Sequence, residues 1–184
     1  RLFESGYFQR VNELRFKRLL RKMENHVILC GYGRVGQEIS NQIKTQNIPI
    51  IVVESDEDRK KIAEENGLEV LCADATLDET LKLAGLEKCK SLVVTLPNDA
   101  ANLYVVLSAK GIRSSIRVIA RAGTEEAASK LRLAGASIVV SPYIAAGRAM
   151  ASMALRPIAI DFLDLLAGSE CEIEEFELSN DISL

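Results

Sequence analysis

The sequence has 184 residues and a mass of 20.2 kDa, enough for one domain with a proper hydrophobic core, or for one domain and an appendage. Apolar residues make up 48% and charged residues 27%, which excludes disordered and collagen-like classes. The net charge of −3 argues against a nucleic-acid binder with an overall basic field. No apolar run approaches the roughly 20 residues of a membrane-spanning helix, so the sequence predicts a soluble domain.

The two ends of the chain carry opposite charge. Residues 1–25 hold seven Lys or Arg and three Glu, whereas the last fifteen residues hold six acids and no base. This contrast indicates different surroundings for the two ends. The first residue is Arg1 rather than Met, so we expect the chain to be a fragment of a longer protein.

Cysteine and histidine usage argues against a disulfide framework and against a zinc site. The four cysteines, Cys30, Cys72, Cys89 and Cys171, form no CxxC pair, and His26 is the single histidine. This usage fits a reducing cytosol. Cys30 and Cys72 fall within apolar runs, and we expect both to be core residues.

From residue 26 onward, short apolar runs alternate with helical patterns. Apolar runs so continuous are typical of parallel strands that are covered on both faces. Six such repeats with short connections predict an α/β fold with a Rossmann-like, doubly wound, mainly parallel six-stranded sheet. The predicted strands are 26–30, 48–54, 68–74, 91–96, 115–122 and 137–142, and the helices between them are 35–45, 56–66, 76–84, 99–110 and 125–133.

Three segments flank this 26–142 unit. Residues 1–25 have the pattern of a basic amphipathic helix, and residues 143–167 are helical and rich in Ala and Met. Residues 171–178 alternate apolar and acidic side chains, which predicts a half-exposed strand. Because no partner strands remain in the sequence, we interpret residues 168–184 as the start of a truncated C-terminal lobe.

Residues 31–36, GYGRVG, follow the first predicted strand and open a helix. Gly31 permits a tight turn, Gly33 lets the backbone approach a pyrophosphate, and Gly36 lets the helix pack closely on the sheet. The free N–H groups at the start of this helix suit phosphate. The pattern predicts a nucleotide site, and its alternative is a glycine turn in a Rossmann-like domain that binds no nucleotide.

Glu54 ends the second predicted strand, 18 residues beyond Gly36. A carboxylate at this place can accept hydrogen bonds from both ribose hydroxyls. Because it also repels a 2′-phosphate, it favours NAD(H) or an adenine nucleotide over NADP.

Further residues follow the other strands at the same edge of the sheet. An adenine edge would sit after the third strand, where capping of the next helix is the alternative role for Asp74 and Thr76, and for Thr76 at least as good a role. The arginine after the fifth strand can reach a phosphate or form a surface salt bridge. In chain order these residues are Asp74, Ala75 and Thr76 after the third strand, Thr95 and Leu96 after the fourth, and Arg121 at the end of the fifth.

The predicted crevice lacks residues arranged for proton transfer. A dehydrogenase needs an acid or a base beside the hydride, but His26 lies at the far end of the first strand, and no Ser/Tyr/Lys or Cys/His arrangement is evident. Nucleotide binding without a catalytic apparatus favours a sensor over an enzyme. The rival interpretations are a soluble NAD-dependent oxidoreductase and an assembly domain whose pocket is empty.

Six segments of the chain resemble one protein family. They are NHVILCGYGRVGQEI, VVE at the end of the second strand, ADAT, VVTLPNDAANL, IARA and GASIVVSPYIAAGRAMA. Together they resemble the RCK (regulator of K+ conductance) or TrkA-N domain of prokaryotic potassium channels, over residues 25–165.

The resemblance implies a homodimer that assembles into an octameric ring. Residues 143–166 would carry the pairing, with 143–155 as a crossover helix, and residues 1–25 would link the domain to membrane pore helices. The chain would then be a cytoplasmic domain of a cell (inner) membrane protein, in which ligand binding regulates K+ conductance allosterically. A peripheral regulatory subunit of a Trk- or Ktr-type K+ transporter is the alternative within the family.

The resemblance also assigns a ligand site. The regulatory ligand would be NAD(H), ATP, ADP or AMP. The calcium-sensing branch of the family has acids after strands four and five, where this chain has Thr95, Arg121 and Gly123, so we do not expect calcium. The implied phosphate loop is Gly31, Gly33, Arg34, Val35 and Gly36, Glu54 is the implied ribose-binding acid, and Asp74, Thr95, Leu96 and Arg121 are implied to line the pocket.

Overall fold

The computed structural model describes residues 23–155. Strands and helices alternate along this part of the chain, as the sequence predicts. Their bounds are β1 (Val27–Cys30), α2 (Arg34–Thr45), β2 (Ile50–Glu54), α3 (Glu57–Glu65), β3 (Glu69–Cys72), α4 (Asp78–Leu83), β4 (Ser91–Val94), α5 (Asp99–Ile112), β5 (Val118–Arg121), α6 (Glu125–Leu133), β6 (Ile138–Val140) and α7 (Pro142–Leu155).

The six strands form one sheet in the order β3-β2-β1-β4-β5-β6. Every neighbouring pair is parallel, with Val27 of β1 opposite both Ile50 of β2 and Ser91 of β4. This order confirms the Rossmann-like, doubly wound fold. The chain moves outward from β1 to β3, then returns to the other side of β1, so β1 and β4 flank the point where the strand order reverses.

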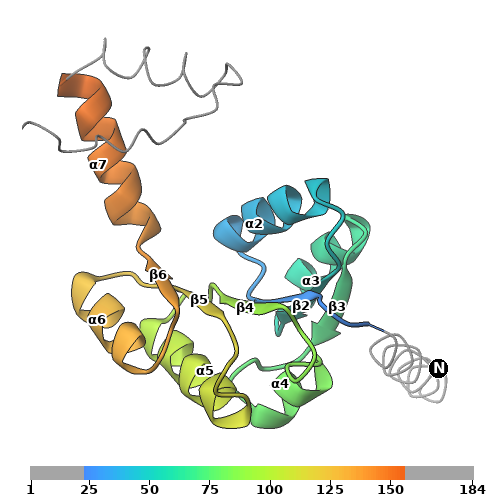
Figure 1. The fold of residues 1–184 in the computed structure, drawn as a ribbon. Helices are drawn as coiled ribbons and strands as arrows, with labels where there is room; N and C mark the ends of the chain where they lie inside the picture. The colour runs from blue at the N-terminus through green and yellow to red at the C-terminus, as the bar shows by residue number, and fades with distance from the viewer. Residues whose placement is uncertain (1–22, 156–184) are drawn as a thin grey trace, which may run out of the picture. The chain divides into compact units, whose positions relative to one another are not determined.

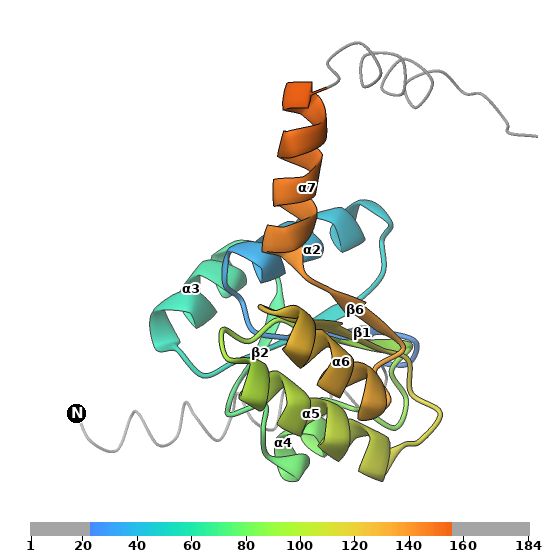
Figure 2. The ribbon, with the colours of Figure 1, turned by 90° about the vertical axis from the view of Figure 1, so that its left-hand side faces the viewer.

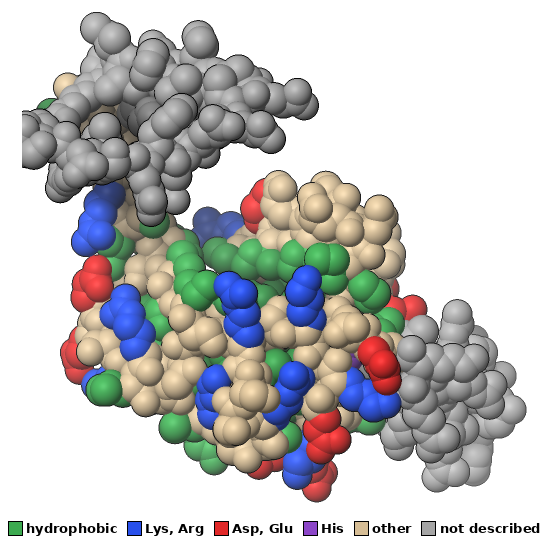
Figure 3. All heavy atoms as spheres, in the orientation of Figure 1, with side chains coloured by type: hydrophobic (Ala, Val, Ile, Leu, Met, Phe, Trp, Pro, Cys, Tyr) green, Lys and Arg blue, Asp and Glu red, His purple; other side chains and the backbone are tan. Residues whose placement is uncertain are grey.

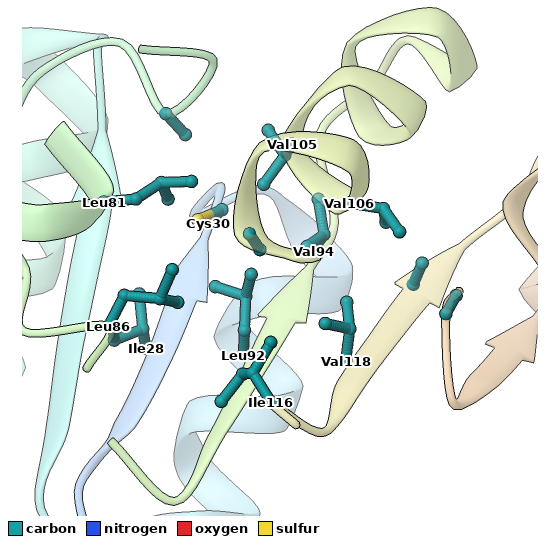
Figure 4. Close-up of a cluster of buried hydrophobic side chains, with 14 of the residues drawn as sticks. Ile28, Cys30, Leu81, Leu86, Leu92, Val94, Val105, Val106, Ile116 and Val118 are labelled. Carbon is teal, nitrogen blue, oxygen red and sulfur yellow. The ribbon is translucent and has the colours of Figure 1, made fainter. Parts of the chain in front are cut away.

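Helices cover both faces of the sheet, with α2 and α3 on one face and α4, α5 and α6 on the other (Figures 1 and 2). Alternate residues of a strand point to opposite faces, so β1 contributes to two cores. Val27 and Leu29 pack in the cluster that includes Ala63 of α3. Ile28 and Cys30 belong to the larger cluster with α4, α5 and α6, whose interdigitated side chains Figure 4 shows.

The two outermost strands of the sheet are less buried than the sequence pattern predicts. Residues of β1 and β2 are all buried, whereas β3 and β6 contain exposed positions. Cys72, expected in the core, is exposed at the end of β3, and its thiol donates to Glu57 Oε1 at 3.2 Å. A continuous apolar run does not distinguish an edge strand from a central one, which is why this expectation was wrong. Cys30, by contrast, is buried as expected.

Among the described residues, those up to Tyr143 belong to one compact unit and residues 144–155 belong to a second unit. None of the residues of α7 is buried. Their pairing with a second copy remains a prediction. Residues 1–22 and 156–184, which include most of the expected linker and the expected C-terminal lobe, lie outside the described residues.

Charge is unevenly distributed over the surface. On the face displayed in Figure 3, Lys and Arg side chains gather over the middle, whereas Asp and Glu lie toward the rim. The net negative charge of the sequence is therefore not spread evenly over the surface, because this face carries a group of basic side chains. Within residues 23–155, no helix is both long enough and apolar enough to span a membrane.

Candidate functional site at the carboxyl edge of the sheet

The loops after β1 and β4 begin side by side where the strand order reverses. Because they lead to α2 and α5 on opposite faces of the sheet, the two loops then turn away from each other. Open α/β sheets bind ligands at such a point. Thr95, directly after β4, holds the loop after β1: its N–H donates to Cys30 O at 2.8 Å. Its hydroxyl lies 3.1 Å from Cys30 O and 3.0 Å from Gly31 O. Thr95 is buried, so it shapes the loop from beneath.

Glycine occupies each of three positions in this loop for a different structural reason. Gly31 has a φ of +95°, which disfavours a side chain. A Cβ on Gly36 would lie 2.2 Å from Gly31 O, so close packing of α2 requires glycine there. Gly33 has a φ of −75°, and a Cβ built on it meets nothing within 4 Å. The fold therefore does not require glycine at residue 33, whereas a ligand that approaches the backbone closely would.

The N-terminus of α2 differs from those of the neighbouring helices. It has no side-chain cap and no acid in its first turn, and exposed Arg34 and half-buried Val35 open it. By comparison, α3, α5 and α6 are capped by Asp56, Asn98 and Thr124 and carry acids in the first turn. The helix α4 also lacks a side-chain cap, but it carries acids in its first turn. Uncapped N–H groups and a partial positive charge make this terminus suitable for an anion.

Glu54, at the end of β2, is joined to the glycine loop. Its Oε2 accepts from Tyr32 N–H at 2.7 Å, and its Oε1 accepts from Asp56 N–H at 3.0 Å. Arg59 Nη1 lies 4.0 Å from Oε2. An ionised carboxylate has about four acceptor positions. Two protein N–H groups therefore leave capacity for ribose hydroxyls, although Glu54 is only 5% exposed.

Tyr32 has a role that the sequence pattern did not reveal. Its side chain is fully buried in the core beside α2 and α3, and its hydroxyl accepts a hydrogen bond from Asn66 Nδ2 at 3.1 Å. An aromatic ring between two loop glycines therefore anchors the loop while its N–H orients Glu54. The only signal in the sequence was an apolar ring in an otherwise small and polar motif.

The loop after β3 lies next to Glu54, because Ala73 N–H donates to Glu54 O at 3.3 Å. Asp74 Oδ1 accepts from the N–H and from the hydroxyl of Thr76, both at 2.8 Å. Asp74 thus closes a local turn, while the N-cap position of α4 belongs to Leu77. Ala75 is buried. The structural role of Asp74 is evident, and its predicted contact with a base remains a prediction.

Leu96 and Arg121 are brought together at the ends of β4 and β5. Arg121 Nη1 lies 3.4 Å from Leu96 O, and its guanidinium lies 5.5 Å from the centroid of the Tyr143 ring. Arg121 Nε is buried and has no hydrogen-bond partner. A surface salt bridge, the alternative role of Arg121, is not among the ion pairs of the described residues.

Two residues of α5 that sequence reasoning missed hold these strand ends. Buried Asn102 bonds to the backbone of Leu96 and of Arg121. Asp99 accepts from Gly123 N–H at 2.9 Å, through Oδ1. The available signal was the pair of polar residues Asp99 and Asn102, about one turn apart at the start of a mostly apolar helix.

Of the groups that could perform acid–base or thiol chemistry, His26 and Cys89 lie away from this edge and Cys30 is buried, whereas Cys72 is exposed at the carboxyl end of β3. His26 Nε2 is 2.9 Å from Ala84 O at the amino end of β1, and burial lowers the pKa of His26. Burial also raises the pKa of Cys30, and raises that of Cys89 to about 11. In the part of the chain that the structure describes, no group of three His, Cys, Asp or Glu side chains could hold a metal ion.

Residues 27–142 match the model of the TrkA-N domain family. Potassium channel protein 1 of Methanocaldococcus jannaschii is 37% identical over 94% of this chain, and this chain spans 53% of that relative. The TrkA-N domain of the Escherichia coli inner membrane protein YbaL is 31% identical, with a TM-score of 0.68 over 72% of this chain and 98% of that one.

A structure of GsuK bound to ADP is also similar. It is 27% identical, with a TM-score of 0.63, over 77% of this chain and 37% of that chain. The family match covers well over half of the present sequence, and it coincides with the described sheet and the helices packed on it. The chain belongs to the TrkA-N domain family.

Proposed function

We propose that this chain is a ligand-sensing domain that binds NAD(H) or an adenine nucleotide and thereby regulates K+ conductance. The carrying observation is the connection between Glu54 and the glycine loop. The hydrogen bond from Tyr32 N–H to Glu54 holds this carboxylate close to the uncapped start of α2, and the proposal assigns ribose to the carboxylate and phosphate to the helix start. Open space at Gly33 supports the same ligand class.

The residues present fit such a ligand. Arg34 and the first N–H groups of α2 would hold phosphate, Glu54 would bind ribose, and Arg121 would supply a second cation from β5. His26 lies at the amino end of β1, away from this site, and the pKa values of the Cys30 and Cys89 thiols are raised. Both observations favour binding without catalysis. The similar GsuK structure contains ADP, which supports an adenine nucleotide.

Regulation of a channel is supported by the M. jannaschii relative, whose name is that of a potassium channel and of which this chain spans about half. We infer that the rest of the protein supplies a membrane pore, and that the exposed helix α7 pairs with a second copy within a ring. A nucleotide can shift such a pore only if it binds the open and closed assemblies with different affinity.

Calorimetric titration of the chain with NAD, NADH, ATP, ADP and AMP tests the binding half of this proposal. Saturable binding of at least one nucleotide is expected, and no response to any of them contradicts it. K+ flux through the full-length protein in vesicles, measured with and without the tightest nucleotide, tests the regulatory half. If K+ flux is the same with and without the bound nucleotide, regulation is contradicted.

A second candidate is the regulatory domain of a K+ transporter rather than of a channel. It is favoured by the similarity to YbaL, which is named a putative cation/proton antiporter. K+ flux through the full-length protein, measured with and without a proton gradient, distinguishes the two candidates. A flux coupled to the gradient would favour a transporter, and a flux independent of the gradient would favour a channel.

A further inference from the structure

Asn102 is a fully buried polar residue whose side-chain hydrogen bonds all reach two strand ends. Its Oδ1 accepts from Leu96 N–H at 3.0 Å, and its Nδ2 donates to Leu96 O at 3.1 Å and to Arg121 O at 3.0 Å. One partner is an N–H and two are carbonyls, so only one orientation of the amide satisfies all three. Both N–H groups of the amide are used.

These contacts lie beyond the last residues that β4 and β5 pair with each other, although Arg121 still pairs with Val140 of β6. The final register pair is Val94 with Ala120, so Leu96 and Arg121 follow the end of the ladder. There the Asn102 amide supplies the donor and the acceptor that a neighbouring strand would otherwise supply. The spacing of these two strand ends is therefore set by a side chain of α5.

The side chain of Arg121 depends on the same carbonyl. Leu96 O accepts from Asn102 Nδ2 and lies 3.4 Å from Arg121 Nη1, while Arg121 Nε has no partner. A guanidinium held so incompletely takes its direction from the few groups around it, here Leu96 O and the Tyr143 ring. Recognition of a phosphate by a guanidinium depends on this direction, because its donors form a planar fork.

We propose that Asn102 is a positioning residue of the nucleotide site, which acts through Leu96 and Arg121 and does not itself touch the ligand. This inference rests on the proposed nucleotide binding. A merely structural Asn102 would lower the stability of the chain when replaced, but the fraction that remains folded would bind nucleotide with unchanged affinity. If Asn102 is a positioning residue, its replacement lowers the nucleotide affinity of the folded chain, and does so only while Arg121 is present.

The test is a double-mutant cycle in which ADP is titrated calorimetrically. The variants are Asn102→Ala, Arg121→Gln and the double variant. Each single change is expected to weaken ADP binding about tenfold, and the double variant is expected to bind no more weakly than Arg121→Gln alone. The matched control is Ile116→Val, a change in a side chain that is 1% exposed at the opposite end of β5. It lowers stability and is expected to leave the affinity unchanged.

Each other outcome has a distinct meaning. If Asn102→Ala binds ADP as the parent does, if Arg121→Gln has no effect, or if the two losses multiply, the positioning role is wrong. If the parent itself binds no nucleotide, the proposed function fails as well. Should Asn102→Ala not fold, Asn102→Ser takes its place in the same cycle, with the same criteria.

Discussion

The main-chain N–H of Tyr32 donates a 2.7 Å hydrogen bond to Oε2 of Glu54. This bond connects the loop after β1 with the end of β2, and the Tyr32 ring anchors the same loop in the core. The carboxylate is thereby oriented before any ligand arrives, which reduces the ordering cost of binding. A pre-oriented acid beside an uncapped helix start is the structural basis of the nucleotide assignment.

Glu54→Gln is expected to weaken nucleotide binding about tenfold, or about 1.4 kcal/mol, because hydrogen bonds to a charged acceptor are the stronger ones. The amide also has only one oxygen for the N–H groups of Tyr32 and Asp56, so the free energy of unfolding should fall by about 1 kcal/mol. Calorimetry and urea unfolding measure the two effects. Glu57→Gln, at an exposed acid on α3, is the control and should bind as the parent does.

Gly36→Ala is expected to lower the free energy of unfolding by about 2 kcal/mol or more. The added Cβ would lie 2.2 Å from Gly31 O, so α2 or the loop must move. Gly111→Ala makes the same chemical change within α5, where a Cβ meets nothing within 4 Å. That control should be more stable than the parent by about 0.5–1 kcal/mol. Equal stability of the two variants in urea would contradict the close packing.

Thr95→Val removes the hydroxyl that lies between Cys30 O and Gly31 O and keeps the shape of the side chain. We expect a loss of about 1 kcal/mol in the free energy of unfolding and weaker nucleotide binding, because the glycine loop loses a support. Thr95→Ser keeps the hydroxyl and should stay closer to the parent in both. If Val and Ser variants bind nucleotide equally, the hydroxyl does not shape the loop.

Stability is expected to decrease as pH falls below about 6.5, the ordinary pKa of histidine. Burial lowers the pKa of His26 in the folded chain, so the unfolded chain takes up a proton first and is favoured at lower pH. His26 Nδ1 is buried without a partner, so a second N–H there would lack an acceptor. His26 is the single histidine, which makes the effect assignable.

Urea unfolding at about pH 5.5 and 7.5 measures this difference. The parent should be less stable at the lower pH, and His26→Gln should lose most of the difference. An equal pH dependence in parent and variant would show that another group is responsible.

Much of the fold was predictable because its signals are local. Apolar runs and helix caps such as Asp56 place the strands and helices, and residues 31–36 with Glu54 mark the site without any knowledge of tertiary contacts. The exposure of Cys72 was not predictable, because an apolar run has the same appearance at an edge of a sheet and at its centre.

The supporting contacts of the site were also beyond the sequence pattern. Asn102 reaches residues on two different strands, and Tyr32 reaches Asn66, 34 positions away. Such contacts depend on how the layers pack, whereas a motif records only residues that are close in the chain. The partners of a buried amide become visible only when both strand ends are in place.

Gly33→Ala, titrated with ADP beside the parent, tests the central claim most directly. The folded chain offers free space for this Cβ at an ordinary φ of −75°, so thermal stability should be unchanged. The nucleotide proposal requires a phosphate close to this backbone, so ADP affinity should fall about tenfold or more. Equal ADP affinity in the two proteins, or no binding by the parent, would contradict nucleotide binding at this loop.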